Sequence, residues 1–132
     1  METVLLIDTE TAFGISLKRK LEQKGYQCII AESGSAAKAL ALQTPPDIIL
    51  CDIIMPDMSG YETFEAFRQE EQFSTIPFIF ITALYDPATH RHGMNLGADD
   101  FLYKPFTAEE AVAAINPVFR GRGYWLNTSR ES

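Results

Sequence analysis

The chain has 132 residues, a length that fits one ordinary domain and is too short for two. Hydrophobic residues make up 46% and charged residues 22% of the sequence, which is typical of a soluble globular protein and excludes a disordered or membrane-spanning chain. The formal net charge of −7 disfavours direct binding to nucleic acid, because an acidic surface repels a polyanion. We therefore expect protein partners.

The two cysteines and the amino terminus indicate a reducing, cytoplasmic setting. Cys28 and Cys51 lie in apolar runs and lack the Cys or His spacing of a metal site. The first residues lead straight into an apolar run with no basic segment before it, and no long apolar stretch follows. We therefore expect a cytoplasmic protein that makes no membrane contact.

Strand-like and helix-like segments alternate along the chain. Apolar runs rich in β-branched residues predict strands at 3–7, 26–31, 47–51, 78–81 and 100–103. Helical spacing and capping residues predict helices at 11–24, 34–43, 61–71, 87–96 and from 108 onward. We expect the last helix to end near Asn116-Pro117, because proline lacks an amide donor and disfavours helical geometry at the residue before it.

This alternation predicts an α/β fold. Nearly unbroken apolar strands joined by helices indicate a parallel sheet with helices on both faces. Right-handed crossovers leave few topologies, and we expect the five-stranded flavodoxin-like order 2-1-3-4-5 by analogy with known folds of this class, because the residues alone do not single it out. In that order, ligands bind beyond the carboxyl ends of the strands, where the first and third strands diverge.

Four polar residues follow strands that should end at this edge: Asp8, Asp52, Thr82 and Lys104. Each has a purely structural alternative, because Asp commonly caps a helix and Thr or Lys at a strand end is commonly just solvated. Together they supply what phosphoryl transfer to an aspartate requires. That chemistry needs a nucleophile, a positive charge for the phosphoryl oxygens and acidic oxygens for a cation.

The same residues carry a resemblance to a known family. Residues 52–60 (Asp-Ile-Ile-Met-Pro-Asp-Met-Ser-Gly) are similar to the phosphoacceptor segment of bacterial two-component response-regulator receivers, and Lys104-Pro105-Phe106 is similar to their lysine motif. Residues 4–8, 82–83 and 97–101 match in the same order, so the resemblance spans residues 3 to 119. The chain most resembles receivers of the chemotaxis-regulator type.

The resemblance implies a role for each site residue. Asp52 would accept a phosphoryl group from a histidine kinase or phosphotransfer protein, and Lys104 would pair with a phosphoryl oxygen. Mg²⁺ would bind to Asp8, Asp52 and the backbone carbonyl of Ile54. Thr82 and Phe101 would act as switch residues, Pro105 would follow a cis peptide bond, and the fourth helix, fifth strand and fifth helix would form the partner face.

One position departs from the family pattern. Receivers have a second acidic residue directly after the first, whereas Thr9 follows Asp8 here. A hydroxyl in place of a carboxylate should weaken Mg²⁺ binding, and we expect Glu10 to point elsewhere at the start of the helix. The alternative to a phosphorylated receiver is therefore a pseudo-receiver that binds a partner without phosphorylation. We expect no enzyme activity beyond assistance with the chain's own phosphorylation and dephosphorylation.

The sequence predicts a receiver domain at 1–119 and a tail or linker at 120–132. The output would be a separate protein target or an attached output domain. We expect a monomer or a weak dimer, because residues 107–119 contain no Lys or Arg for the ion pairs through which some DNA-binding regulators dimerise. His90 and His92 are two residues apart on a helix, so we expect separate faces, solvent exposure and no shared metal.

Overall fold

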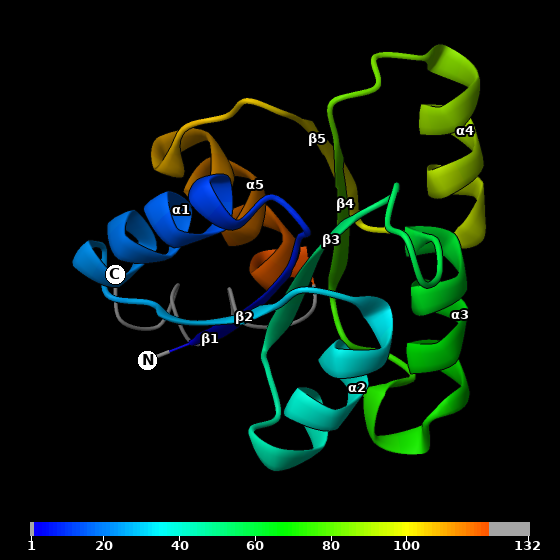
Figure 1. Ribbon diagram of the computed structural model, residues 1–132, viewed down its shortest axis with the longest axis horizontal. Helices are drawn as coiled ribbons and strands as arrows, with labels where there is room; N and C mark the ends of the chain where they lie inside the picture. The colour runs from blue at the N-terminus through cyan, green and yellow to red at the C-terminus, as the bar shows by residue number, and fades with distance from the viewer. Residues whose placement is uncertain (1, 122–132) are drawn as a thin grey trace.

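The computed structural model describes residues 2–121 and contains one parallel sheet in the predicted order, β2-β1-β3-β4-β5 (Figure 1). The strands are β1 (Thr3–Ile7), β2 (Gln27–Ala31), β3 (Ile48–Asp52), β4 (Phe78–Thr82) and β5 (Asp100–Tyr103). The helices are α1 (Thr11–Gln23), α2 (Gly34–Gln43), α3 (Gly60–Gln69), the 3₁₀ turn η1 (Glu71–Phe73), α4 (Pro87–Leu96) and α5 (Ala108–Gly121). Among residues 2–121, no helix has both the length and the apolar character needed to cross a membrane.

Two apolar cores lie on the two faces of the sheet. Successive side chains of a strand point to opposite faces, so Val4 and Leu6 enter one core while Leu5 and Ile7 enter the other. Helices α1 and α5 cover the first face, and α2, α3 and α4 cover the second (Figure 1). Because both faces are buried, the strands read as continuous apolar runs, and this is why the sequence pattern located them.

Side chains cap most of the helices. Ser33 caps α2 as predicted, and Asp86 caps α4. Ser59 and Thr107 begin α3 and α5 as capping boxes, each exchanging hydrogen bonds with a glutamate three residues later. Helix α1 differs, because its cap residue Glu10 makes no side-chain hydrogen bond to the helix. The Glu10 side chain is therefore left for another role.

The predicted end of the last helix is wrong. Helix α5 continues through Pro117 to Gly121. Asn116 and Pro117 lie on the exposed side, whereas Ile115 and Val118 on either side of them are buried in the core beneath α5. Packing of that apolar face holds the helix together and outweighs the hydrogen bond that proline removes. Most of the predicted tail at 120–132 lies outside the described residues.

The loop after β3 closes against the strand at Gly60. The Gly60 N–H donates a 2.7 Å hydrogen bond to the carbonyl of Ile53. A Cβ atom at Gly60 would lie 2.4 Å from the carbonyl oxygen of Asp52 and 2.8 Å from the Cα of Ile53. Those neighbours are backbone atoms, so they cannot turn aside as a flexible side chain can. Only glycine fits there without shifting the loop that carries Asp52.

We expect Gly60→Ala to lower the free energy of unfolding by about 2 kcal/mol or more, because the added methyl group collides with backbone. Gly14→Ala in α1 is the matched control. Its Cβ would make ordinary contacts of 3.6 Å or more, so removing a helical glycine should stabilise the protein by about 0.5–1 kcal/mol. Urea denaturation measures both effects, and a loss of equal size in the two variants would contradict the steric argument.

Candidate functional site

Lys104 lies at the centre of an acidic cluster at the carboxyl edge of the sheet. Its Nζ is 3.1 Å from Asp8 Oδ1, 2.5 Å from Glu10 Oε1 and 3.3 Å from Asp52 Oδ2. Asp8 follows β1, Asp52 ends β3 and Lys104 follows β5, so the parallel sheet assembles the cluster from distant segments. The predicted convergence of Asp8, Asp52 and Lys104 is confirmed.

The two aspartates are buried beside each other because β1 and β3 are neighbouring strands. Asp8 is 1% exposed and Asp52 is 6% exposed. Asp8 Oδ1 accepts hydrogen bonds from Lys104 Nζ and, at 2.9 Å, from the Glu10 N–H. The Ile54 N–H lies 3.4 Å from Asp52 Oδ1. The negative charges of the two buried carboxylates are thus stabilised by few hydrogen-bond donors, and Lys104 is the donor that both carboxylates share.

The electrostatics of the cluster follow from burial and crowding. Burial raises the pKa of Asp52 above its usual value, and the charge of Asp8 raises it further, while Lys104 only partly opposes them. Burial disfavours the charged form of Lys104, but the hydrogen bond with Glu10 and the charges of Asp52 and Asp8 outweigh it. The pKa of Lys104 is therefore raised, and the lysine remains a cation at neutral pH.

Thr82 ends β4 at the same edge and is fully buried. Its carbonyl accepts a 2.8 Å hydrogen bond from the Lys104 N–H, and its hydroxyl oxygen accepts one at 3.1 Å from the Leu84 N–H. Ile54 and Leu84 follow Asp52 and Thr82 by two residues, and they are 65% and 45% exposed. These two side chains have not turned into the core.

An aromatic stack connects α4 with β5. The ring of Phe101 is buried, 4.7 Å from the ring of His90 and 6.0 Å from the ring of Phe80. His90 Nδ1 and the Tyr103 hydroxyl form a 2.9 Å hydrogen bond. His90 is therefore half-buried, and the prediction that it is solvent-exposed is wrong. His92 is exposed, and its ring lies 4.6 Å from that of Tyr61.

The cluster has the chemistry of a site for a hard divalent cation. Carboxylate oxygens of Asp8, Glu10 and Asp52 all lie within 4.8 Å of one another. Among the described residues, Asp8 Oδ2 is the buried side-chain polar atom that makes no hydrogen bond, although Lys104 Nζ lies 3.1 Å away. This oxygen is held by the ion pair with Lys104 and by no hydrogen bond, so it could take a cation as a ligand in place of the ammonium, and the residues present fit a Mg²⁺ ion.

Sequence reasoning missed two residues of this site. Glu10 was expected to point away, but the Asp8 side chain bonds to its backbone and Glu10 turns back to Lys104. The Phe13 ring lies 5.0 Å from Lys104 Nζ and 5.2 Å from the ring of Phe106. The sequence placed Phe13 only within the helix predicted at 11–24. The Lys104-Pro105 peptide bond is cis as predicted, and it carries the chain from the site towards Phe106.

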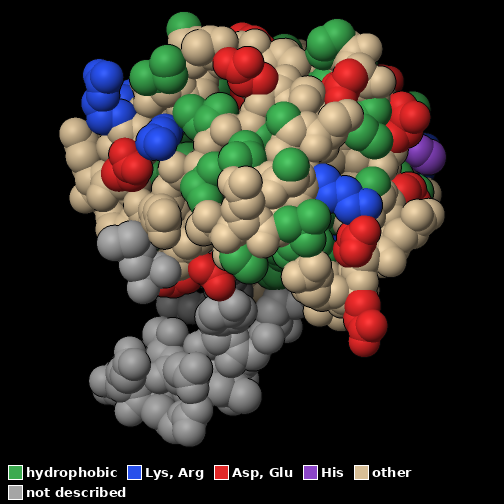
Figure 2. All heavy atoms as spheres, turned by 60° about the horizontal axis from the view of Figure 1, so that its bottom comes forward, with side chains coloured by type: hydrophobic (Ala, Val, Ile, Leu, Met, Phe, Trp, Pro, Cys, Tyr) green, Lys and Arg blue, Asp and Glu red, His purple; other side chains and the backbone are tan. Residues whose placement is uncertain are grey.

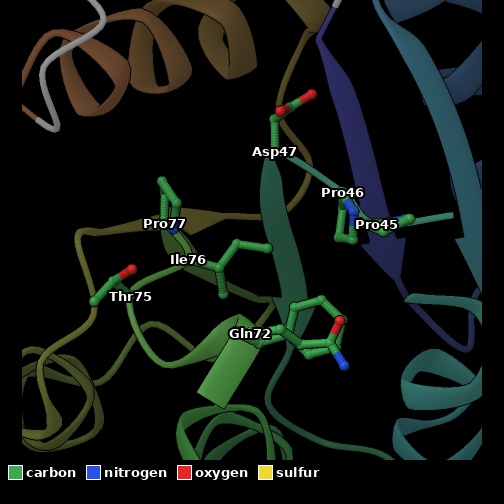
Figure 3. A pocket seen from close by; sticks show the side chains of 8 residues that line it. Pro45, Pro46, Asp47, Gln72, Thr75, Ile76 and Pro77 are labelled. Atoms are coloured by element: carbon green, nitrogen blue, oxygen red, sulfur yellow. The ribbon is translucent and has the colours of Figure 1, made fainter. Parts of the chain in front are cut away.

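A hollow lies at the opposite edge of the sheet from the acidic cluster, where β3 and β4 begin (Figure 3). It is lined by Pro45, Pro46, Asp47, Gln72, Phe73, Thr75, Ile76 and Pro77. The Asp47 carboxylate points away from Gln72 and Ile76 and accepts a 2.6 Å hydrogen bond from the Thr3 N–H. In Figure 2, which turns the lower side of Figure 1 forward, apolar side chains gather mid-face among scattered charges. This hollow has a structural carboxylate and no grouping like that around Lys104.

Comparison with known proteins gives relatives among transcriptional regulators. The chain is 34% identical to the phosphate regulon transcriptional regulatory protein PhoB of Pseudomonas aeruginosa, over 92% of this chain and 53% of PhoB. It is 38% identical to the transcriptional regulatory protein CpxR of Escherichia coli, over 95% of this chain and 52% of CpxR. The chain thus spans about half the length of these curated relatives.

Solved structures match the whole domain. The chemotaxis protein CheY4 of Vibrio cholerae is 30% identical, with a TM-score of 0.84 and coverage of 89% of this chain and 98% of CheY4. The receiver domain of a histidine kinase from Syntrophus aciditrophicus is also 30% identical, with a TM-score of 0.81 and 92% coverage of each chain. The response regulator receiver domain family matches residues 4–116. Because that match includes nearly the whole sheet and the whole acidic cluster, the chain belongs to the response regulator receiver domain family.

Proposed function

We propose that this chain is a phosphorylated receiver in which Asp52 takes a phosphoryl group from a histidine kinase or phosphotransfer protein. The observation that supports the proposal most strongly is the position of Lys104, whose ammonium group contacts both buried aspartates. A carboxylate oxygen of Asp52 would attack phosphorus while the bond from phosphorus to the donor breaks. Lys104 would then pair with a phosphoryl oxygen, which brings new negative charge to the place where a cation already lies.

Mg²⁺ is part of this proposal. Asp8 and Asp52 would hold the ion together with the carbonyl of Ile54, and the buried Oδ2 of Asp8, which makes no hydrogen bond and is ion-paired with Lys104, supports this assignment. When bound, the ion would offset the charge of the phosphoryl oxygens. The protein itself aligns the nucleophile and supplies Lys104, so we propose that the chain assists its own phosphorylation and dephosphorylation and catalyses no other reaction.

We propose that the signal leaves the site through Thr82. Its hydroxyl oxygen accepts a hydrogen bond from the Leu84 N–H. After phosphorylation, the hydroxyl group would instead donate a hydrogen bond to a phosphoryl oxygen. Thr82 is paired in register with Tyr103 on β5, and Tyr103 is bonded to His90 on α4. A shift at Thr82 therefore reaches the face formed by α4, β5 and α5, with Phe101 as the aromatic residue that repacks.

The comparisons support a proposal about the partners. PhoB and CpxR are transcriptional regulators about twice as long as the match, whereas CheY4 is matched almost completely. We propose a cytoplasmic protein that acts on a protein target or through an attached output domain. The acidic receiver itself would not contact nucleic acid.

We expect Asp52→Asn to abolish phosphoryl incorporation, because the amide keeps the shape of the carboxylate and loses its nucleophilic charge. The measurement is mass spectrometry of the intact protein after incubation with a small acyl phosphate donor and Mg²⁺, followed by peptide mapping. Asp57→Asn on the exposed loop is the control and should still be labelled. Label that persists in Asp52→Asn would place the acceptor elsewhere, and an unlabelled parent would favour the pseudo-receiver alternative.

Asp52→Asn should also raise the thermal stability of the metal-free protein at pH 7. Because the pKa of Asp52 is raised in the folded state, the folded protein holds this proton more tightly than the unfolded chain does. Ionisation therefore weakens folding as the pH rises from the usual value of 3.8 through the folded pKa, and the loss is complete above it. Melting curves in EDTA should show a gain at pH 7 that shrinks below pH 4. A gain of the same size at both pH values would point to another cause.

We expect the aspartyl phosphate to be long-lived, because the exposed apolar side chains of Ile54 and Leu84 cannot orient an attacking water. Combining Ile54→Asn with Leu84→Glu should speed loss of the phosphoryl group on the order of tenfold or more. Leu42→Asn, at an exposed apolar position on α2, is the control and should leave the decay unchanged. Decay of the purified phosphoprotein is followed over time, and rapid loss from the parent would contradict the prediction.

A further inference from the structure

We infer that Glu10 supplies the second acidic ligand for the divalent cation, because position 9 is Thr9 and not an acid. We also infer that the Lys104 ammonium occupies the position of this cation in the metal-free protein. The inference rests on the proposed function, because it concerns the metal of the same site. It assigns to Glu10 a role that neither its position in the motif nor its place at the start of α1 predicts.

The geometry of Glu10 carries the first step. Its carboxylate is grouped with those of Asp8 and Asp52 within 4.8 Å, although its side chain is 60% exposed and free to adopt other rotamers. The Glu10 N–H donates to Asp8 Oδ1, so the chain turns tightly after β1. This turn brings the residue two positions after Asp8 back over the carboxyl edge of the sheet.

The start of α1 gives the second step. A glutamate at a helix cap contributes little to capping, and here it makes no side-chain bond to the helix. The helices α2, α3 and α4 all have side-chain caps. The Glu10 side chain therefore does not cap α1 and contacts the acidic cluster instead.

Asp8 Oδ2 is an independent observation that points to a ligand. The residue is 1% exposed, yet this oxygen makes no hydrogen bond within the described part of the chain. In the metal-free protein its contact is the ion pair with Lys104 Nζ, 3.1 Å away. A cation held between Asp8, Asp52 and Glu10 would compensate that oxygen.

The charges of the cluster favour a divalent ion. When all three carboxylates are ionised, Lys104 balances one of them and two negative charges remain. The Lys104 ammonium lies within 3.3 Å of oxygens from all three, where a metal ion would meet the same ligands. A divalent cation would therefore have to compete with the Lys104 ammonium for these oxygens.

The test measures metal binding without phosphorylation. Mn²⁺ binding to the full chain is followed by electron paramagnetic resonance, and Mg²⁺ is then added as a competitor. The variants are Glu10→Gln, Thr9→Ala and, as a charge-matched control on the exposed side of α3, Glu65→Gln. Glu10→Gln should weaken binding by about tenfold or more, whereas Thr9→Ala and Glu65→Gln should change it by less than about threefold. Melting curves check that every variant is folded.

Lys104→Met separates a direct role of Glu10 from an effect through the lysine. Removing the competing ammonium should tighten Mn²⁺ binding, and adding Glu10→Gln in that background should again weaken it by about tenfold. An unchanged affinity in Glu10→Gln, a loss confined to Thr9→Ala, an effect of Glu10 that vanishes with Lys104→Met, or a parent that binds no Mn²⁺ would each overturn the inference. Phosphoryl labelling of Asp52 in the parent is scored separately, so the proposed function can stand when this inference fails.

Discussion

The structure depends on one lysine ammonium that three carboxylates share. Two aspartates buried side by side repel each other and lose most of their hydration, so a cation beside them stabilises their ionised forms. Lys104 supplies that cation from a strand that does not adjoin either aspartate. Its Nζ also lies 5.0 Å from the centre of the Phe13 ring on α1.

The loop after β3 and the start of α1 both have unusual local structure next to the acidic cluster. The loop after β3 returns to the strand at Gly60, where backbone contacts leave no space for a Cβ. Helix α1 begins without a side-chain cap because Glu10 faces Lys104. The close backbone contact at Gly60 and the missing side-chain cap of α1 both lie near Asp52. Functional sites commonly keep such locally unfavourable features, because their geometry serves chemistry and not stability.

The same fold gives the site a route to a surface. Strand β4 carries Thr82 beside Asp52, and β5 carries Phe101 and Tyr103 towards α4. The Tyr103–His90 hydrogen bond is a polar contact between β5 and α4, next to the buried ring of Phe101. These contacts lie on the α4 side of the sheet, whereas Leu17 and Ile115 belong to the separate core beneath α1 and α5.

The sequence by itself determined the alternation of strands and helices, the parallel character of the sheet and the convergence of Asp8, Asp52 and Lys104. Strands buried on both faces leave an unambiguous apolar pattern, and residues at the carboxyl ends of parallel strands must share an edge. Only the tertiary structure decided the direction of Glu10, the burial of His90 and the passage of α5 through Pro117. Local preference pointed the wrong way at each of these positions. Contacts with residues remote in sequence outweigh it there, because an ion pair, an aromatic stack or an apolar face is stronger than a single residue's intrinsic tendency.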